Sequence, residues 1–323
     1  MIGLIARRLA QAPLILLAIY TITFVLAWAL PGSAVLNDEG RRPPPEVIAA
    51  MEARYNLDDP ASFYLEYLYR ASGAMWAVET VRGGEPPAFI FDFGPSFRYE
   101  DWSVNELIAS SLPVSVTLGL AAIVLALAIG VTAGIIGALR PNSPADVATL
   151  AVALIGISLP SFVVGTLLLM IFPVWLGVGT VGGWGRPQDM ILPAVTLSLP
   201  FAAYIARLTR MGMIDVLGAD YIRTARAKGV PGMRVVTRHA LKNAFLPVLS
   251  YLGPACAFAM TGSFVVERVF NVPGIGQHFV NAVKNKDLFV IMGITLIYSG
   301  MLILLNLLVD VLYRWVDPRI DQS

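Results

Sequence analysis

Six long apolar stretches, separated by charged loops, dominate the pattern of hydrophobic and polar positions. They are Leu9–Leu30, Leu107–Leu139, Val147–Phe172, Met190–Ala206, Asn243–Val266 and Leu288–Val309. The first is an uncharged run of 22 residues, and a helix of this length extends roughly 33 Å, enough to cross a hydrocarbon core of about 30 Å. Because backbone groups in lipid must hydrogen-bond within their own segment, each stretch predicts a helix. We therefore expect an all-α integral membrane protein with six transmembrane helices.

The N-terminal stretch has a second interpretation. Arg7 and Arg8 precede its apolar run, as in a signal peptide that would be cleaved after Ala34. The apolar core of a signal peptide is usually about 7–15 residues long, however, and this run is longer. A retained first span is the expectation.

The distribution of Lys and Arg predicts the orientation. The loop from Arg207 to Lys242 holds eight basic residues and two acidic ones, whereas residues 31–105 carry six Arg and twelve Asp or Glu. Loops rich in Lys and Arg stay in the cytoplasm. Both termini are therefore predicted to be cytoplasmic, and residues 31–105 form a large extracytoplasmic segment after the first helix.

The chain thus divides into two predicted parts. Residues 1–105 comprise the first transmembrane helix and the extracytoplasmic segment, and residues 106–323 comprise a five-helix core. Within the segment, a proline-rich linker leads to a helix-compatible stretch, and Asp59 before Pro60 predicts the start of a second short helix. Residues 71–91 contain several Gly and Pro, which predicts a surface loop. Prolines in or near the spans predict kinked helices around a cavity, or are ordinary membrane-helix prolines: Pro160, Pro193, Pro200, Pro247 and Pro254.

Composition supports the membrane assignment and limits the partners. Hydrophobic residues make up 57% of the chain and charged residues 14%, against about 25% charged in a typical soluble domain. The net charge of +1 creates no field that would attract nucleic acid. The single cysteine, Cys256, cannot form an intrachain disulfide and is expected to be a small core residue.

Catalytic and nucleotide-binding motifs are missing from the sequence. There is no Gly-Lys dipeptide, so the phosphate-binding loop GxxxxGK[ST] is absent. The two histidines are too few for the usual histidine-built metal sites. A Ser-His hydrolase is an unfavoured alternative, because His239 and His278 lie in loops away from Ser158 and Ser263. If the protein works against a gradient, the energy must come from a partner.

The basic loop has a pattern of its own. Residues from Ala219 to Lys228 favour a helix, with Asp220 in its first turn and basic residues towards its end, which complements the helix dipole. Gly229 stands where a helix-terminating glycine with positive φ belongs, and Pro231 can open the next helix, which runs into the fifth span. Small residues at Ala225 and Ala227 leave room for another protein. The alternative is a basic loop that only fixes topology, and charge alone does not separate the two.

Several motifs resemble a known family. Ala225, Ala227, Gly229, Leu246 and Pro247 match the coupling-loop pattern of binding-protein-dependent ABC importer permeases. The strings YIRTARAKG and HALKNAFLPV resemble the dipeptide, oligopeptide and nickel permeases, as do ARRL near the N-terminus and residues 92–118, 266–277 and 306–320. The first, B-type, of two permease subunits is the most similar. Two features depart from the family: Gly218-Ala219-Asp220 replaces a Glu-Ala-Ala pattern, and residues 71–91 look like an insertion.

The resemblance implies a type I ABC importer-like fold and a permease subunit in the bacterial inner membrane. Its implied partners are a second homologous permease, two ATPase subunits or domains, an extracytoplasmic substrate-binding protein and membrane lipid. The chain itself would bind no cofactor, because ATP and Mg belong to the ATPases. The implied substrate is a peptide, with nickel or another small solute as the alternative. Within the coupling loop 211–242, the residues implied to contact the ATPase are Asp220, Tyr221, Arg223, Ala225, Ala227, Lys228 and Gly229.

The translocation cavity is predicted from polar residues inside the spans. The candidates are Ser158, Thr196, Ser198, Thr261 and Ser263. Hydroxyls that bond the backbone of their own helix are the alternative. No full charge is expected at mid-membrane, which disfavours a secondary transporter, since such proteins usually carry intramembrane ionisable groups. A membrane scaffold, the third class, would not need the Gly229 pattern.

Overall fold

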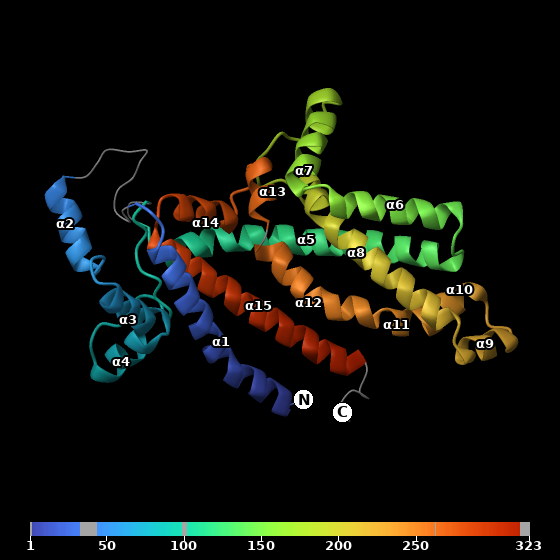
Figure 1. The fold of residues 1–323 in the computed structure, drawn as a ribbon, viewed down its shortest axis with the longest axis horizontal. Helices are drawn as coiled ribbons and strands as arrows, with labels where there is room; N and C mark the ends of the chain where they lie inside the picture. Colours follow the sequence, from blue (N-terminus) through green and yellow to red (C-terminus); the bar gives the residue numbers. More distant parts are fainter. Residues whose placement is uncertain (1, 33–43, 99–101, 262, 317–323) are drawn as a thin grey trace. The chain divides into compact units, whose positions relative to one another are not determined.

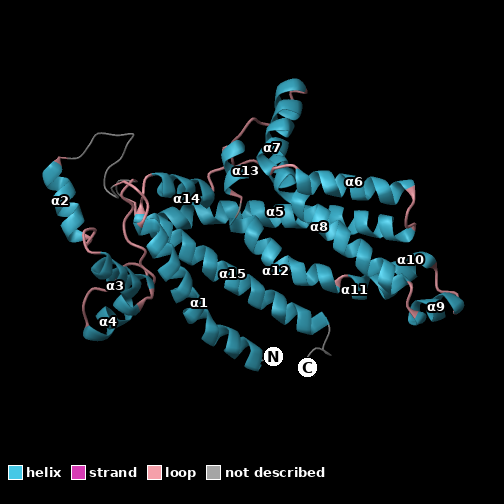
Figure 2. Ribbon diagram, viewed as in Figure 1, coloured by secondary structure: helices cyan, strands magenta, loops and turns pink. Residues whose placement is uncertain are grey.

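The computed structural model describes residues 2–32, 44–98, 102–261 and 263–316, and these residues form helices and loops without a β-strand (Figures 1 and 2). The elements in chain order are α1 (Ile2–Trp28), α2 (Pro45–Arg54), α3 (Pro60–Ala71), α4 (Ala74–Arg82), α5 (Val104–Leu139), α6 (Pro144–Ser158), α7 (Ser161–Leu169), η1 (Met170–Trp175), η2 (Pro187–Met190), α8 (Ile191–Leu217), α9 (Asp220–Ala227), α10 (Gly232–Arg234), η3 (Val235–Ala240), α11 (Leu241–Ala244), α12 (Leu246–Thr261), α13 (Phe264–Val269), α14 (Ile275–Lys284) and α15 (Leu288–Val316).

The helices are long and apolar enough to account for the predicted spans. Five segments qualify as membrane-crossing by length and composition, and the count rises to six if one bent pair is a single span. All six predicted apolar stretches overlap these segments. The all-α prediction is therefore confirmed, with five to six candidate spans in the described part of the chain.

The bent pair corrects the prediction of one continuous helix over Val147–Phe172. Helices α6 and α7 meet at an angle of 102°. Between them, Leu159 is extended, with φ −85° and ψ 128°, because the ring of the following Pro160 disfavours helical geometry in the residue before it. Pro160 itself precedes the first residue of α7. The proline therefore separates two helices instead of kinking one.

The segment before α5 is more helical than the sequence predicts. Asp59 caps α3 as expected: its carboxylate accepts hydrogen bonds from the Ala61 backbone N–H, at 3.0 Å, and from the Ser62 hydroxyl. The Ser62 hydrogen bond, followed by the backbone N–H groups, lowers the pKa of Asp59. The predicted surface loop over residues 71–91 is wrong, because α4 occupies part of it. Gly73 and Gly83 bound that helix with φ of 79° and 72°.

The described chain divides into two compact units. The first, here called the α8 unit, comprises Met1–Ile2, Ser115–Pro273 and Leu302–Ser323, and the second, the α3 unit, comprises Gly3–Val114 and Gly274–Met301. Helices α5 and α15 contribute residues to both. The predicted boundary at residue 105 therefore does not coincide with the boundary between compact units. That boundary was drawn from the expected membrane topology, and the division at residue 105 remains a prediction.

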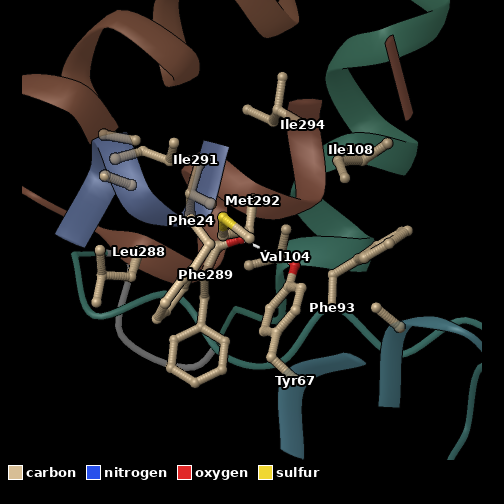
Figure 3. Close-up of a cluster of buried hydrophobic side chains, with 14 of the residues drawn as sticks. Phe24, Tyr67, Phe93, Val104, Ile108, Leu288, Phe289, Ile291, Met292 and Ile294 are labelled. Atoms are coloured by element: carbon tan, nitrogen blue, oxygen red, sulfur yellow. Dashed lines mark hydrogen bonds between the residues drawn. The ribbon is translucent and has the colours of Figure 1, made fainter. Parts of the chain in front are cut away.

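The α3 unit has a core of aromatic rings (Figure 3). Phe289, at the start of α15, is 4% exposed and its ring lies 5.2–5.7 Å, centroid to centroid, from the rings of Tyr55, Phe63, Tyr67 and Phe97. Aromatic pairs at such separations add attraction to the burial of their area. This core joins α1, α3, the loop before α5 and the first turns of α15.

A buried carboxylate completes this core. Asp287 accepts hydrogen bonds from the Ser96 hydroxyl at 2.9 Å, from the Phe97 backbone N–H at 3.1 Å and from the Val290 N–H at 3.3 Å. Burial raises the pKa of Asp287 above its usual range, against the opposing effect of these donors. The carboxylate thus holds the loop before α5 against the start of α15.

The α8 unit is assembled by close backbone approach. A Cβ added to Gly130 would lie 2.6 Å from the Ala202 carbonyl oxygen, and one added to Gly134 would lie 2.6 Å from that of Ala206. On α11, the Ala244 carbonyl oxygen lies 2.6 Å from where a Cβ of Gly212 would be. Small residues permit such helix contacts in membranes. Helix α8 therefore has close neighbours along its length.

Candidate functional site

Helix α9 is a two-sided helix attached to the end of α8. Its residue Ile222 is fully buried, in a cluster with Met213, Val235 and Ala240. On the other side, Tyr221 is 45% exposed, and the side chains of Arg223 and Asp220 are 74% and 96% exposed. The helix is thus anchored by one buried apolar side chain and has a polar, exposed surface on its other side.

The end of α9 confirms the predicted conformation of Gly229. Its φ is +78°, its N–H donates to the Arg226 carbonyl at 2.9 Å, and the Val230 N–H donates to the Ala225 carbonyl at 3.2 Å. This pair of bonds is the Schellman arrangement, which needs a left-handed residue at this position. Open space surrounds the α-carbon of Gly229, since an added Cβ would meet no atom within 4 Å.

The segment after Gly229 differs from the single second helix that the sequence predicts. Pro231 does precede a helix, but the chain runs through α10, a π-helical turn η3 and α11 before α12 begins. A side-chain hydrogen bond links this segment to α9: the Asn243 amide donates to the Tyr221 hydroxyl at 3.0 Å. Met233, which the prediction omitted, is 73% exposed in the same segment.

The seven predicted coupling residues lie on one short segment, from the first residue of α9 to the glycine just past its C-terminal cap. Six are exposed, and Ala225 is partly buried. Among the residues that the structure describes, the contacts between side chains on this surface are the Tyr221–Asn243 bond and a 3.4 Å contact between Arg223 and Asp220. The surface is defined below as the α9 surface: Asp220, Tyr221, Arg223, Ala225, Ala227, Lys228 and Gly229.

The predicted cavity residues differ in exposure and in their hydrogen bonds. Ser158 is exposed at the end of α6, whereas Thr196 and Ser198 are buried. The hydroxyls of Thr196, Ser198 and Thr261 donate to carbonyls of their own helices, at 2.8 Å each. That is the alternative that the sequence left open, and the cavity assignment stays a prediction.

Two buried carboxylates are not among the predicted site residues. Glu267 on α13 is fully buried and accepts hydrogen bonds from the hydroxyls of Ser115, at 2.6 Å, and Ser263. Asp146 on α6 forms a two-bond ion pair with Arg210 on α8. The sequence does contain a signal for Asp146. Ser143 lies three residues before it, and Ser and an acidic residue at this spacing ahead of an apolar run are typical of a helix N-terminus. Nothing in the sequence indicated that Arg210 would reach it.

Comparison with known proteins decides the family. Residues 130–322 match the binding-protein-dependent transport system inner membrane component family, and residues 1–121 match the N-terminal region of such membrane components. The chain belongs to this permease family. It is 46% identical over 323 residues to the oligopeptide transport system permease protein OppB of Escherichia coli K12, covering 99% of both chains. It is 42% identical over 318 residues to the dipeptide transport system permease protein DppB of Bacillus subtilis, covering 98% of this chain and 97% of that one.

A solved structure shares the fold. An inward-facing conformation of the MetNI methionine ABC transporter matches with a TM-score of 0.52 and 17% identity, over 66% of this chain and 97% of that chain. At this identity the likeness concerns the fold alone. The sequence comparisons confirm the family resemblance, and the fold is that of ABC importer permeases.

Family membership settles the class of protein. The chain is a permease subunit of a binding-protein-dependent transport system and a multi-pass inner membrane protein, and it is not an enzyme. ATP hydrolysis belongs to separate subunits of such a system. The hydrolase, secondary-transporter and scaffold alternatives are therefore set aside.

Proposed function

We propose that this permease forms half of the translocation pathway of an ATP-driven importer for peptides. The support for peptides comes from the full-length similarity to permeases that are named for oligopeptide and dipeptide transport. The single observation that supports the coupling role is the two-sided helix α9, anchored by buried Ile222 and exposed over the α9 surface.

The proposed partners follow from the system in which such a permease works. They are a second homologous permease, two ATPase subunits or domains, an extracytoplasmic substrate-binding protein and the surrounding lipid. ATP and Mg would be held by the ATPases. A displacement of α9 on ATP binding would reach the spans through Ile222, whose packing against Met213 connects the helix to the end of α8.

The proposal includes an orientation, with both termini and the α9 surface cytoplasmic and residues 31–105 extracytoplasmic. It rests on the eight basic residues between Arg207 and Lys242. A cysteine introduced at Arg226, after replacement of Cys256 by Ser, should react with an impermeant maleimide only in inverted vesicles. Reaction in intact cells would contradict the orientation.

Reconstitution tests the function itself. The chain, its second permease and its ATPases are purified together and placed in liposomes, and uptake of radiolabelled trialanine is followed with the purified binding protein. We expect saturable uptake that requires ATP. Uptake of Ni²⁺ but not trialanine under the same conditions would replace the peptide assignment by the nickel alternative. The isolated chain should bind no ATP, because it lacks a phosphate-binding loop.

A further inference from the structure

An ion pair connects helix α6 to helix α8. The Arg210 Nε donates to Asp146 Oδ1 at 2.6 Å, and Nη2 donates to Oδ2 at 2.7 Å. The Asp146 side chain is 1% exposed and that of Arg210 is 20% exposed. Asp146 Oδ2 also accepts the Asn142 backbone N–H at 2.8 Å. Bidentate pairs fix the relative position of both partners, and breaking one in a buried setting leaves an uncompensated charge.

The surroundings leave this pair little freedom. A Cβ added to Gly137 of α5 would lie 2.9 Å from Asp146 Oδ1 and 3.4 Å from Arg210 Cδ. One turn earlier, a Cβ on Gly134 would lie 2.6 Å from the Thr209 Cβ. Three helices therefore enclose the two side chains at van der Waals distance, and only glycine on α5 permits this.

The same part of α8 carries the α9 helix. From Arg210 the helix runs without a break to Leu217, and Met213 lies between these two residues in the buried cluster with Ile222. Only Gly218 and Ala219 separate the end of α8 from α9. Within these two turns α8 thus binds α6 through charge at Arg210 and packs apolar side chains with α9 at Met213, three residues later on the same side of the helix.

Helix α6 leads away from the pair towards the bend of 102° before α7. Ser158, its last residue, is exposed. A displacement of α8 that is passed to Asp146 would therefore move the α6–α7 bend.

We propose that Asp146 and Arg210 are positioning residues that make α6 move with the coupling helix α9. This inference rests on the proposed function, in which α9 receives the movement of the ATPases. The ion pair then contributes to the transport mechanism and not only to the stability of the fold. Without it, the ATPases would still hydrolyse ATP but α6 would no longer move with α9.

The test uses the complex with the second permease and the ATPases in liposomes, with Cys256→Ser and Ser158→Cys in the chain. Maleimide labelling at position 158 is measured without nucleotide and after turnover with ATP and vanadate, which traps ADP and vanadate in the ATPases, and ATP hydrolysis is measured in parallel. In the otherwise unaltered complex, labelling should change on trapping. In Arg210→Gln, hydrolysis should stay near the unaltered rate while the labelling change shrinks at least about fivefold, the lower end of a typical coupling between sites.

Two further variants control the experiment. Arg207→Gln makes the same substitution on an exposed residue of α8 one turn earlier and should leave both readouts unchanged. Arg210→Lys keeps the charge but not the two-bond geometry, and should lose less of the labelling change than Arg210→Gln. If Arg210→Gln does not assemble, Arg210→Lys decides.

Three results would overturn the inference: a labelling change that survives in Arg210→Gln, a fall of hydrolysis and labelling change in equal proportion, or no labelling change in the unaltered complex. Failure of the proposed function has a different signature, since the unaltered chain would then not associate with the ATPases at all.

Discussion

Each of the two compact units is packed internally by a different kind of residue. Around Phe289 the α3 unit packs large aromatic rings from four separate segments, and it buries the Asp287 carboxylate among hydrogen-bond donors. Along α8 the other unit packs glycine and alanine, so that backbones touch, and adds an ion pair. The aromatic rings bury a large apolar area that is shared among many contacts. Close backbone contacts and ion pairs, by contrast, form at only one relative position of the two helices.

This contrast suggests different tasks. A core of interlocking rings resists displacement in any direction and suits a fixed structure. In the α8 unit, close backbone contacts fix how the helices meet, and α8 adds an ion pair to α6 and an apolar cluster with α9. We therefore expect mutations in the α3 unit to affect stability first, and mutations near α9 to affect coupling first.

The largest effect on stability is expected from Phe289→Ala. This change removes a side chain that is 4% exposed and surrounded by four aromatic rings, and such truncations cost about 3–5 kcal/mol. Thermal unfolding in detergent measures it. Leu65→Ala, at a 64% exposed site on α3, is the control and should change little. A loss below about 1 kcal/mol for Phe289→Ala would show that the rings are not a stabilising core.

A smaller loss is expected where backbones touch. Gly134→Ala would place a Cβ 2.6 Å from the Ala206 carbonyl oxygen, and overpacking of this kind costs about 1–3 kcal/mol. Gly156→Ala adds the same methyl group at ordinary contact distance, 3.4 Å from the nearest atom. Denaturation midpoints of the two variants should therefore separate. Equal midpoints would contradict the tight backbone contact at Gly134 on which the description of the α8 unit rests.

Next in size is Gly229→Val, which acts on coupling. The site has φ +78° and open space around it, so the cost is backbone strain of roughly 1–2 kcal/mol without an internal clash. Membrane insertion and pairing with the second permease should stay normal, while ATPase co-purification and uptake fall strongly.

Two controls accompany this variant. Gly232→Val is also in open space but has no positive φ, and Glu79→Gln lies on α4, remote in sequence from the coupling loop. Both should retain association and uptake. Wild-type uptake by Gly229→Val would mean that the loop only determines topology.

The smallest effect is expected at the cap of α3. The pKa of Asp59 is lowered from its ordinary value of 3.8, so its carboxylate stabilises the fold above that pH, and the contribution is lost as pH falls through the lowered pKa. Asp59→Ala should lower the unfolding temperature slightly at pH 7, and the difference from wild type should shrink in acid. A difference that grows in acid would contradict the capping role.

Much of this architecture follows from the sequence alone. The apolar stretches predict every candidate span because lipid requires each segment to satisfy its own backbone. Asp59 and Gly229 predict the start of α3 and the end of α9, because capping depends on a few neighbouring residues and on the sign of φ. The motifs around Gly229 also indicate the family, since they are short strings of neighbouring residues that need no tertiary contact to be recognised.

Other features depended on the tertiary structure. The helix α4 lies in a segment whose Gly and Pro predict a loop, because two glycines there bound a helix instead of interrupting it. Asp146 and Arg210 are 64 residues apart in the chain, and no local rule links them. Only the packing of α5, α6 and α8 brings the two charges into one enclosed space. The glycines of α5 contribute to this only because side chains of α6 and α8 lie opposite them. Local order is therefore encoded in neighbouring residues, whereas the contacts that can transmit movement depend on which helices meet.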